Sequence, residues 1–434
     1  MPSYTPPLRD MQFVMHELLH VVDDLKAMPA HADMDADTMN AVLEEGGKFA
    51  SEILFPLNMT GDAEGCQLDQ TTHQVTTPKG FKEAYTQYVA GGWPALSSDP
   101  AYGGQGLPLI VNQFFYEMLN SANQAWTMYP GLTHGAYASL ATHGTDAQKA
   151  TYLGKMVSGE WTGTMCLTEP HCGTDLGLMR TRAEAQPDGT YRITGNKIFI
   201  SAGEHDMSGN IVHLVLARLS DAPPGIKGVS LFIVPKFLVN EDGSLGERNG
   251  IYCGGLEHKM GIKGSATCQM VLDGAVGTLV GAPNKGMNGM FVMMNAARLG
   301  VGNQSLALTE VAYQNALAYA KDRQSFGTAI FNHQAVGFRL ADCATQLEAA
   351  RQLIWHAASL RDAGRPCLKE AAMAKLFASE MAEKVCSAAI QTLGGYGYVS
   401  DFPLERIYRD VRVCQIYEGT SDVQKIIIQR SLAA

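Results

Sequence analysis

Apolar residues recur at helical spacing in the first part of the chain, and its last part carries helical signals of a different kind. From Asp37 to Ile53 they follow a period near 3.6, with Asp35 or Asp37 as a possible N-cap. The same pattern predicts further N-terminal helices over residues 81–90, 109–120 and 146–158. The end of the chain is rich in Ala, Met and Leu without strand signals, and it predicts antiparallel helices over residues 289–321, 334–362, 367–393 and 421–433.

Between these helical parts the pattern changes to that of strands. Strands are predicted at residues 191–201, 211–218, 229–234 and 268–272, and turn sequences such as PDG, APPG and EDGS connect them. The order helices, strands, helices predicts an α+β protein. We place an N-terminal helical domain at 1–164, an antiparallel middle β-domain at 165–282 and a C-terminal helical bundle at 283–434.

Composition narrows the choice of partner and compartment. The 434 residues carry a formal net charge of -10 with a pI of about 5.6, which argues against nucleic acid as a partner. No run of eighteen apolar residues and no signal-peptide core is present, so we expect no membrane insertion and a cytoplasmic protein. The nine cysteines are scattered and never spaced as CxxC, which suits a reducing compartment.

One motif points to a different chemistry. His16 to His20 reads HELLH, the pattern of zinc proteases, on a plausible helix. A pattern with three fixed positions arises often by chance, no third ligand follows at the usual spacing, and the neighbouring apolar residues explain an amphipathic helix. We therefore expect no metal site.

Four other segments carry candidate chemistry. Residues 165–175 (MCLTEPHCGTD) mix hydroxyls with Pro and Gly kinks that suit a polar planar ligand, although an ordinary strand-to-loop corner would look similar. Residues 197–203 (KIFISAG) end a strand with an aromatic and a hydroxyl. The glycines of 391–397 (QTLGGYG) either approach a pyrophosphate or end a helix. In YEGTS, Glu418 precedes a Gly turn and a Thr/Ser N-cap, where an acidic residue also favours the helix N-terminus.

Taken together with DRQSFG at 322–327 and HQ at 333–334, these segments resemble the acyl-CoA dehydrogenase family from about residue 92 to residue 432. The front half resembles the long bacterial branch that includes methylthiopropionyl-CoA dehydrogenases, and the back half resembles short-chain and medium-chain enzymes. The resemblance implies a C-terminal four-helix bundle. It also implies FAD-dependent α,β-dehydrogenation of an acyl-CoA to the trans-2-enoyl-CoA, as in fatty-acid β-oxidation.

The resemblance also implies where the cofactor lies. The flavin lies between the β-domain and the last bundle, with Ser201 at the position of a threonine that binds flavin N5 and Phe199 where tryptophan is frequent. Arg323 is expected to meet phosphate of an FAD held mainly by a neighbouring subunit. The cofactor-binding residues implied are Met165, Cys166, Leu167, Thr168, Gly173, Thr174, Phe199, Ile200, Ser201, Arg323, Phe326, Gln334, Gln391, Gly394, Gly395, Thr420 and Asp422.

Glu418 is the expected catalytic base. Some family members carry the base on an earlier helix, but residues 286–309 contain no Asp or Glu. An apolar cleft is expected to raise the pKa of Glu418, and its backbone N–H is expected to help hold the thioester oxygen. The substrate-binding residues implied are Thr174, Asn295, Arg298, Tyr417 and Gly419.

The resemblance implies a homo-oligomer and an electron-transferring flavoprotein as partner. The branch that the front half resembles often dimerises, and the branch that the back half resembles forms tetramers. We favour a tetramer over a dimer. Three alternatives remain open: an acyl-CoA oxidase that uses O2, a flavin-binding protein of the DNA-associated alkylation-response branch, and a flavin-binding protein of this fold without dehydrogenase turnover.

Overall fold

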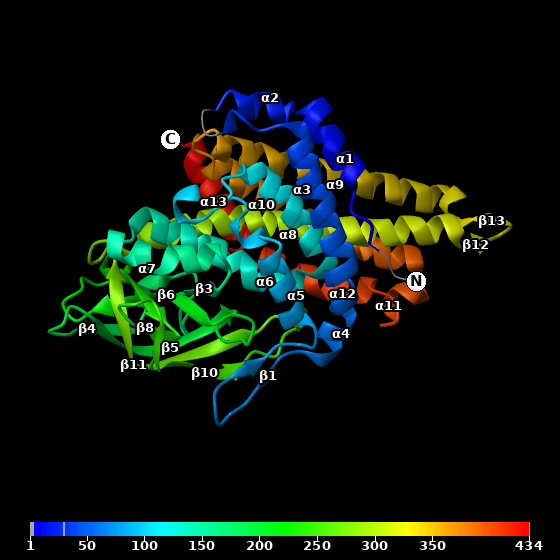
Figure 1. The fold of residues 1–434 in the computed structure, drawn as a ribbon. Helices are drawn as coiled ribbons and strands as arrows, with labels where there is room; N and C mark the ends of the chain where they lie inside the picture. The colour runs from blue at the N-terminus through cyan, green and yellow to red at the C-terminus, as the bar shows by residue number, and fades with distance from the viewer. Residues whose placement is uncertain (1–3, 29–30, 434) are drawn as a thin grey trace.

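The computed structural model describes residues 4–28 and 31–433, and Figure 1 shows a long helical body with a β-domain against one side. The N-terminal part is helical, as the sequence predicts. Asp35 caps the third helix by accepting a hydrogen bond from Thr38 N at 2.7 Å. The helices are α1 (Leu8–Phe13), α2 (Val21–Lys26), α3 (Ala36–Lys48), α4 (Pro56–Glu64), α5 (Phe81–Ala90), α6 (Leu109–His143) and α7 (Asp146–Val157); β1 (Gln67–Leu68) and β2 (Val75–Thr76) form a small hairpin.

Helix α6 matters most for the site. It continues far beyond the predicted end at residue 120, but Asn123 has non-helical torsions (φ -159°, ψ 85°) and divides it into two arms. Both arms are largely buried, with α8 (Gly286–Asp322) packed on the helix and β3 (Trp161–Cys166) beside it.

The HELLH segment does not form the regular helix expected for it. Residues Val14–Leu18 make one π-helical turn, and His20 takes a left-handed conformation (φ 49°) before α2 begins. His16 Nε2 lies 2.9 Å from Asn40 Oδ1, which occupies that ring nitrogen.

The middle domain is a seven-stranded sheet in which β7 pairs with both β11 and β6. The pairings β11–β5–β4–β6–β7–β11 close a ring, so each of these five strands has a partner on both sides. Most pairings in the sheet are antiparallel, as predicted, but β3 and β4 run parallel to β6. The strands are β3, β4 (Arg182–Ala185), β5 (Tyr191–Ser201), β6 (Asn210–Leu219), β7 (Val229–Pro235), β10 (Ile251–Leu256) and β11 (Thr267–Val280), with a separate hairpin of β8 (Phe237–Val239) and β9 (Leu245–Arg248).

The predicted strand at 191–201 matches β5 to the residue, whereas the sequence missed β3. The six residues of β3 read WTGTMC, so the segment lacks the Val, Ile and aromatic run that is typical of a buried strand, although every one of its residues is buried.

The C-terminal part is a bundle of long helices, as predicted. Arg351 ties it to α6: its guanidinium bonds Glu117 of α6 and Glu310 of α8, each at 2.8 Å. The helices are α8, α9 (Gln334–Asp362), α10 (Leu368–Leu393), α11 (Gly395–Tyr398), α12 (Leu404–Val411) and α13 (Ser421–Leu432), and β12 (Gln324–Ser325) and β13 (Thr328–Ala329) form a hairpin at one end (Figure 1). Within the described ranges, each helix is too short or too polar to cross a membrane.

Candidate active site

Glu418 lies in a tight turn that the sequence encodes locally. Glu418 and Gly419 both adopt left-handed conformations, with φ values of 56° and 87°. Glycine tolerates this conformation without strain, whereas a glutamate is uncommon there. Thr420 then caps α13 by accepting a hydrogen bond from Val423 N at 3.3 Å, which confirms the predicted N-cap.

Two buried side chains hold the carbonyl groups of this turn. Lys375 of α10 is fully buried, and its Nζ donates to Tyr417 O at 2.9 Å and also to Gly419 O. Gln424 of α13, also fully buried, donates to Gly419 O at 2.9 Å. Within residues 4–28 and 31–433 the backbone N–H of Glu418 donates to no acceptor, so it is free to bind a ligand.

The surroundings of Glu418 set its protonation. Desolvation by burial raises the pKa of Glu418 to about 7, although the positive charges of Lys375 and Arg298 oppose that rise. Burial likewise lowers the pKa of Lys375 to about 8. A carboxyl group with a pKa near neutrality can take and release a proton under ordinary conditions.

Glu418 and Tyr417 line a narrow cleft between α8 and the two arms of α6, with a volume of about 100 Å³. Tyr417 is fixed there, because its hydroxyl donates to Gln304 Oε1 and accepts from Gln124 Nε2 at 3.0 Å. The α8 wall consists mainly of small or apolar side chains, among them Met293, Ala296, Ala297 and Gly300. The cleft suits a narrow, flexible acyl chain.

Arg298 lies on the same helix as this wall and is only 3% exposed. It donates to Asn295 Oδ1, and its Nε has no partner among the described residues. Asn295 itself is exposed. A buried guanidinium with a free donor is suited to fixing a polar ligand beside Glu418.

The two segments expected to contact a planar ligand meet at the end of β5. Ile198 N donates to Thr168 O at 2.9 Å, which holds the 165–175 loop against this strand. The buried Lys197 Nζ adds two bonds to the same loop, to Leu167 O at 3.0 Å and to Glu169 Oε1 at 2.9 Å. The two predicted segments therefore form one continuous surface.

This surface presents an exposed ring and unused hydroxyls. Phe199 is 60% exposed and has a left-handed conformation with φ 58°. Within the part of the chain that the structure describes, the hydroxyls of Thr168 and Ser201 have no hydrogen-bond partner. An exposed ring beside free hydroxyls fits a planar polar ligand.

The remaining residues predicted to bind the cofactor differ in how exposed they are. The side chains of Met165, Cys166 and Ile200 are in the core, which leaves mainly the backbone of these residues for a ligand. Leu167 is partly buried, whereas Gly173 and Thr174 are exposed on the loop. Figure 1 shows the β12–β13 hairpin at the end of the bundle away from the β-domain. The predicted cofactor-binding residues on or near that hairpin are all exposed: Arg323, Phe326, Gln334, Gln391, Gly394 and Gly395. Asp422 is exposed on α13.

The sequence did not identify Lys375 as part of the site. A signal was present, because Lys375 falls on the same helical stripe as the buried Ala371, Ala378 and Ala382, where a lone lysine is unusual. The polar side chains of the cleft wall, such as Gln304, carried no comparable signal.

Comparison with known proteins gives a consistent result along the chain. Family models of acyl-CoA dehydrogenases match in order: the N-terminal domain at residues 67–160, the middle domain at 164–275 and the C-terminal domain at 284–433. A 3-methylmercaptopropionyl-CoA dehydrogenase of Ruegeria pomeroyi is 42% identical over 97% of this chain and 75% of its own length.

Two further proteins similar to this chain support the same family. The caffeyl-CoA reductase-Etf complex subunit CarC of Acetobacterium woodii is 38% identical over 84% of this chain and 92% of its own. The solved structure of butyryl-CoA dehydrogenase from Megasphaera elsdenii superimposes with a TM-score of 0.80 at 30% identity, covering 92% of this chain and 98% of that one. The chain therefore belongs to the acyl-CoA dehydrogenase family, whose members are FAD-dependent flavoproteins.

Proposed function

We propose that this protein oxidises a saturated acyl-CoA to the trans-2-enoyl-CoA, with Glu418 as the base that takes the α-proton. The observation that carries the proposal is the position of Glu418: its carboxyl group lines the acyl cleft and has a pKa near 7. Bound FAD supplies the acceptor for the hydride that leaves the β-carbon. Substrate binding, positioning and proton transfer are assigned to residues of this protein.

The free N–H of Glu418 supports a second role for this residue. As the α-proton leaves, negative charge develops on the thioester oxygen, and a backbone donor fixed nearby stabilises it. Lys375 and Gln424 hold the neighbouring carbonyls, which keeps this N–H in a defined direction. Tyr417 and Gly419 flank the base, and Arg298 with Asn295 and Thr174 remains our assignment for the polar part of the substrate.

The edge of β5 supports the flavin site. Phe199 offers an exposed ring, and Ser201 and Thr168 offer hydroxyls that the described part of the protein does not use. These residues fit the flavin, and Thr420 lies beside the base at the start of α13. We assign Gly173, Leu167 and the backbone of the buried residues to the same site.

The exposed set around Arg323 suggests how the rest of FAD is held. These residues lie at the hairpin end of the bundle, which favours their contact with the FAD of a neighbouring subunit. Arg323 is the residue that we assign to phosphate, because a guanidinium binds it in bidentate fashion. The protein would then be a homo-oligomer, with a tetramer favoured over a dimer. Arg323→Ala should lower the FAD content per subunit, measured by visible absorbance, while Arg365→Ala serves as the surface control.

For the electron acceptor we propose an electron-transferring flavoprotein, in a cytoplasmic setting. The name of the Acetobacterium woodii relative, a subunit of an Etf complex, supports this partner. Steady-state peroxide formation in air would instead identify an oxidase.

The test of the reaction is anaerobic bleaching of the flavin band by a panel of saturated acyl-CoAs. Wild type should bleach, Glu418→Gln should not, and Glu348→Gln should behave as wild type because that carboxylate is 48% exposed on α9 and does not line the cleft. If wild type binds FAD but no acyl-CoA reduces it, the protein is a flavin-binding member without dehydrogenase turnover. Normal bleaching by Glu418→Gln would refute the assignment of the base.

A further inference from the structure

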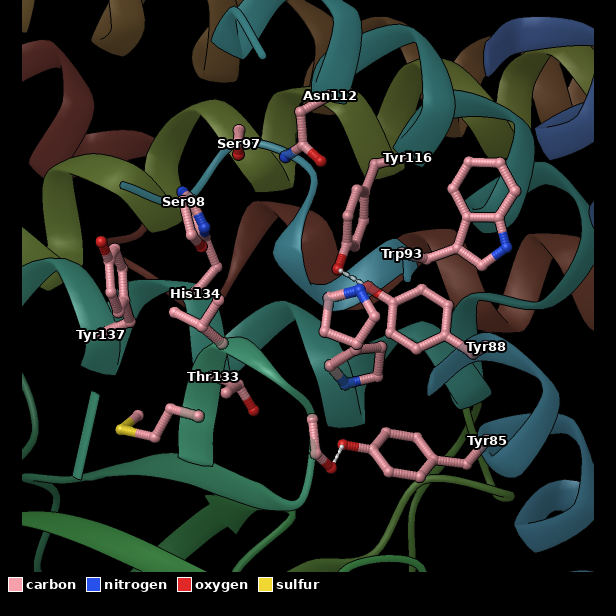
Figure 2. A pocket seen from close by; sticks show the side chains of 15 residues that line it. Tyr85, Tyr88, Trp93, Ser97, Ser98, Asn112, Tyr116, Thr133, His134 and Tyr137 are labelled. Atoms are coloured by element: carbon pink, nitrogen blue, oxygen red, sulfur yellow. Dashed lines mark hydrogen bonds between the residues drawn. The ribbon is translucent and has the colours of Figure 1, made fainter. Parts of the chain in front are cut away.

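A second cavity adjoins the cleft that holds Glu418. It lies between α5 and both arms of α6, and its volume of about 20 Å³ has room for about one water molecule (Figure 2). Asn112, Tyr116 and His134 line both cavities, so the wall between them consists of polar side chains. An acyl chain that follows the cleft away from Glu418 therefore meets these three residues.

Some of the polar side chains around the two cavities have hydrogen-bond partners and others have none. Tyr116 and Tyr88 share a hydrogen bond of 3.0 Å between their hydroxyls, so Tyr116 has a partner. Asn112 is only 7% exposed and Ser98 only 3%, yet neither side chain bonds any residue of the described chain, and the same holds for the His134 ring. Buried polar groups are normally hydrogen-bonded, so these side chains are suited to a ligand or to water.

Charge decides which kind of group they would accept. Among the described residues that line the two cavities, Glu418 is the one carboxylate, and neither lysine nor arginine takes part. Burial lowers the pKa of His134 to about 4, and the charge of Arg361 acts in the same direction. His134 is therefore a neutral imidazole near pH 7, with one donor and one acceptor. An ionised group would lose its hydration there without gaining a counter-charge.

The geometry of α6 gives the length of acyl chain that would extend from Glu418 to His134. Asn112 and His134 lie on opposite arms of α6, each eleven residues from the break at Asn123. Met128, whose sulfur is 4.0 Å from the Tyr417 hydroxyl, marks the end of the cleft near the base. His134 follows six residues later, which is roughly 9 Å along the helix. An extended acyl chain of roughly six to ten carbons covers this span.

We propose that the site selects acyl chains that carry a neutral hydrogen-bonding group, such as a hydroxyl or a carbonyl, near their far end, and that Asn112 and His134 recognise that group. The inference rests on the proposed dehydrogenation. A plain alkyl end would displace water from the amide and the imidazole without replacing its hydrogen bonds, whereas a hydroxyl replaces them.

The test compares CoA esters of equal length, hexanoyl to decanoyl, with and without a terminal hydroxyl. The measured quantity is the ratio of kcat/KM for hydroxylated over plain ester with the FAD-loaded protein. We expect a ratio above about tenfold at the length that reaches Asn112, because a site built to bond a hydroxyl discriminates strongly against its absence. Asn112→Leu should bring that ratio to about one.

His134→Phe provides an independent variant should Asn112→Leu fail to fold, and it should lower the same ratio. Thr142→Val is the matched control, because Thr142 lies on the same arm of α6 as His134, bonds Ala138 O at 2.8 Å and lines neither cavity. A ratio near one for wild type at every length, with normal reduction by the plain esters, overturns this inference and leaves the proposed function standing. If no ester of either series reduces the flavin, the proposed function fails and the inference fails with it.

Discussion

Replacing Lys375 with methionine removes a positive charge next to the base while keeping the length of the side chain. The charge of Lys375 lowers the pKa of Glu418, so its loss should raise that pKa above its present value of about 7. An opposite charge nearby shifts a carboxyl pKa by about 1 or more, so we expect a value near 8.

The size of the expected change in rate follows from the fraction of Glu418 that is deprotonated. Only the deprotonated Glu418 accepts the α-proton, so flavin reduction rises with pH through the pKa of Glu418. At pH 7 that fraction falls from about one half to about one tenth when the pKa rises by about 1, which lowers the rate roughly five-fold. By pH 9.5 both proteins are almost fully deprotonated and their rates should converge.

The assay is the anaerobic rate of flavin reduction by one acyl-CoA from pH 6 to pH 9.5. Lys369→Met is the matched control, because Lys369 lies on the same helix but is 39% exposed and forms its ion pair with Glu370. An unchanged midpoint with a lower plateau would refute the electrostatic reasoning. It would mean that Lys375 acts only by holding the carbonyls of Tyr417 and Gly419.

Three further predictions concern stability. Arg351→Met should lower the free energy of unfolding by about 3–5 kcal/mol in denaturant titration, because Glu117 and Glu310 lose a buried partner; an effect below about 1 kcal/mol would contradict this. Thr145→Ala removes the capping box of α7 and should cost about 1 kcal/mol in the same titration. Gly286→Ala should lower the Tm, since an added Cβ would lie 2.4 Å from backbone in β7; an unchanged Tm would show that the backbone yields without cost.

Local patterns were strong enough to predict much of the fold. The alternation in residues 191–201 predicted β5, because that strand has one face more buried than the other. The long Ala-rich, Met-rich and Leu-rich segments without strand signals predicted the bundle, because these residues favour helices wherever they are buried. The same patterns missed β3, which is buried throughout, and the parallel pairing of β3 and β4 with β6. Strand direction depends on connections through space, which local spacing does not record.

For the site, the sequence by itself determined the local turn: Glu418, then a glycine, then the Thr420 N-cap are encoded by neighbouring residues. Only the tertiary structure decided what surrounds that turn. Lys375 comes from α10, and Asn112 and His134 line the same cavity because α6 breaks at Asn123. Burial, charge and shape act between residues distant in sequence, so the pKa of the base and the lining of the acyl cleft emerge only when the chain is folded.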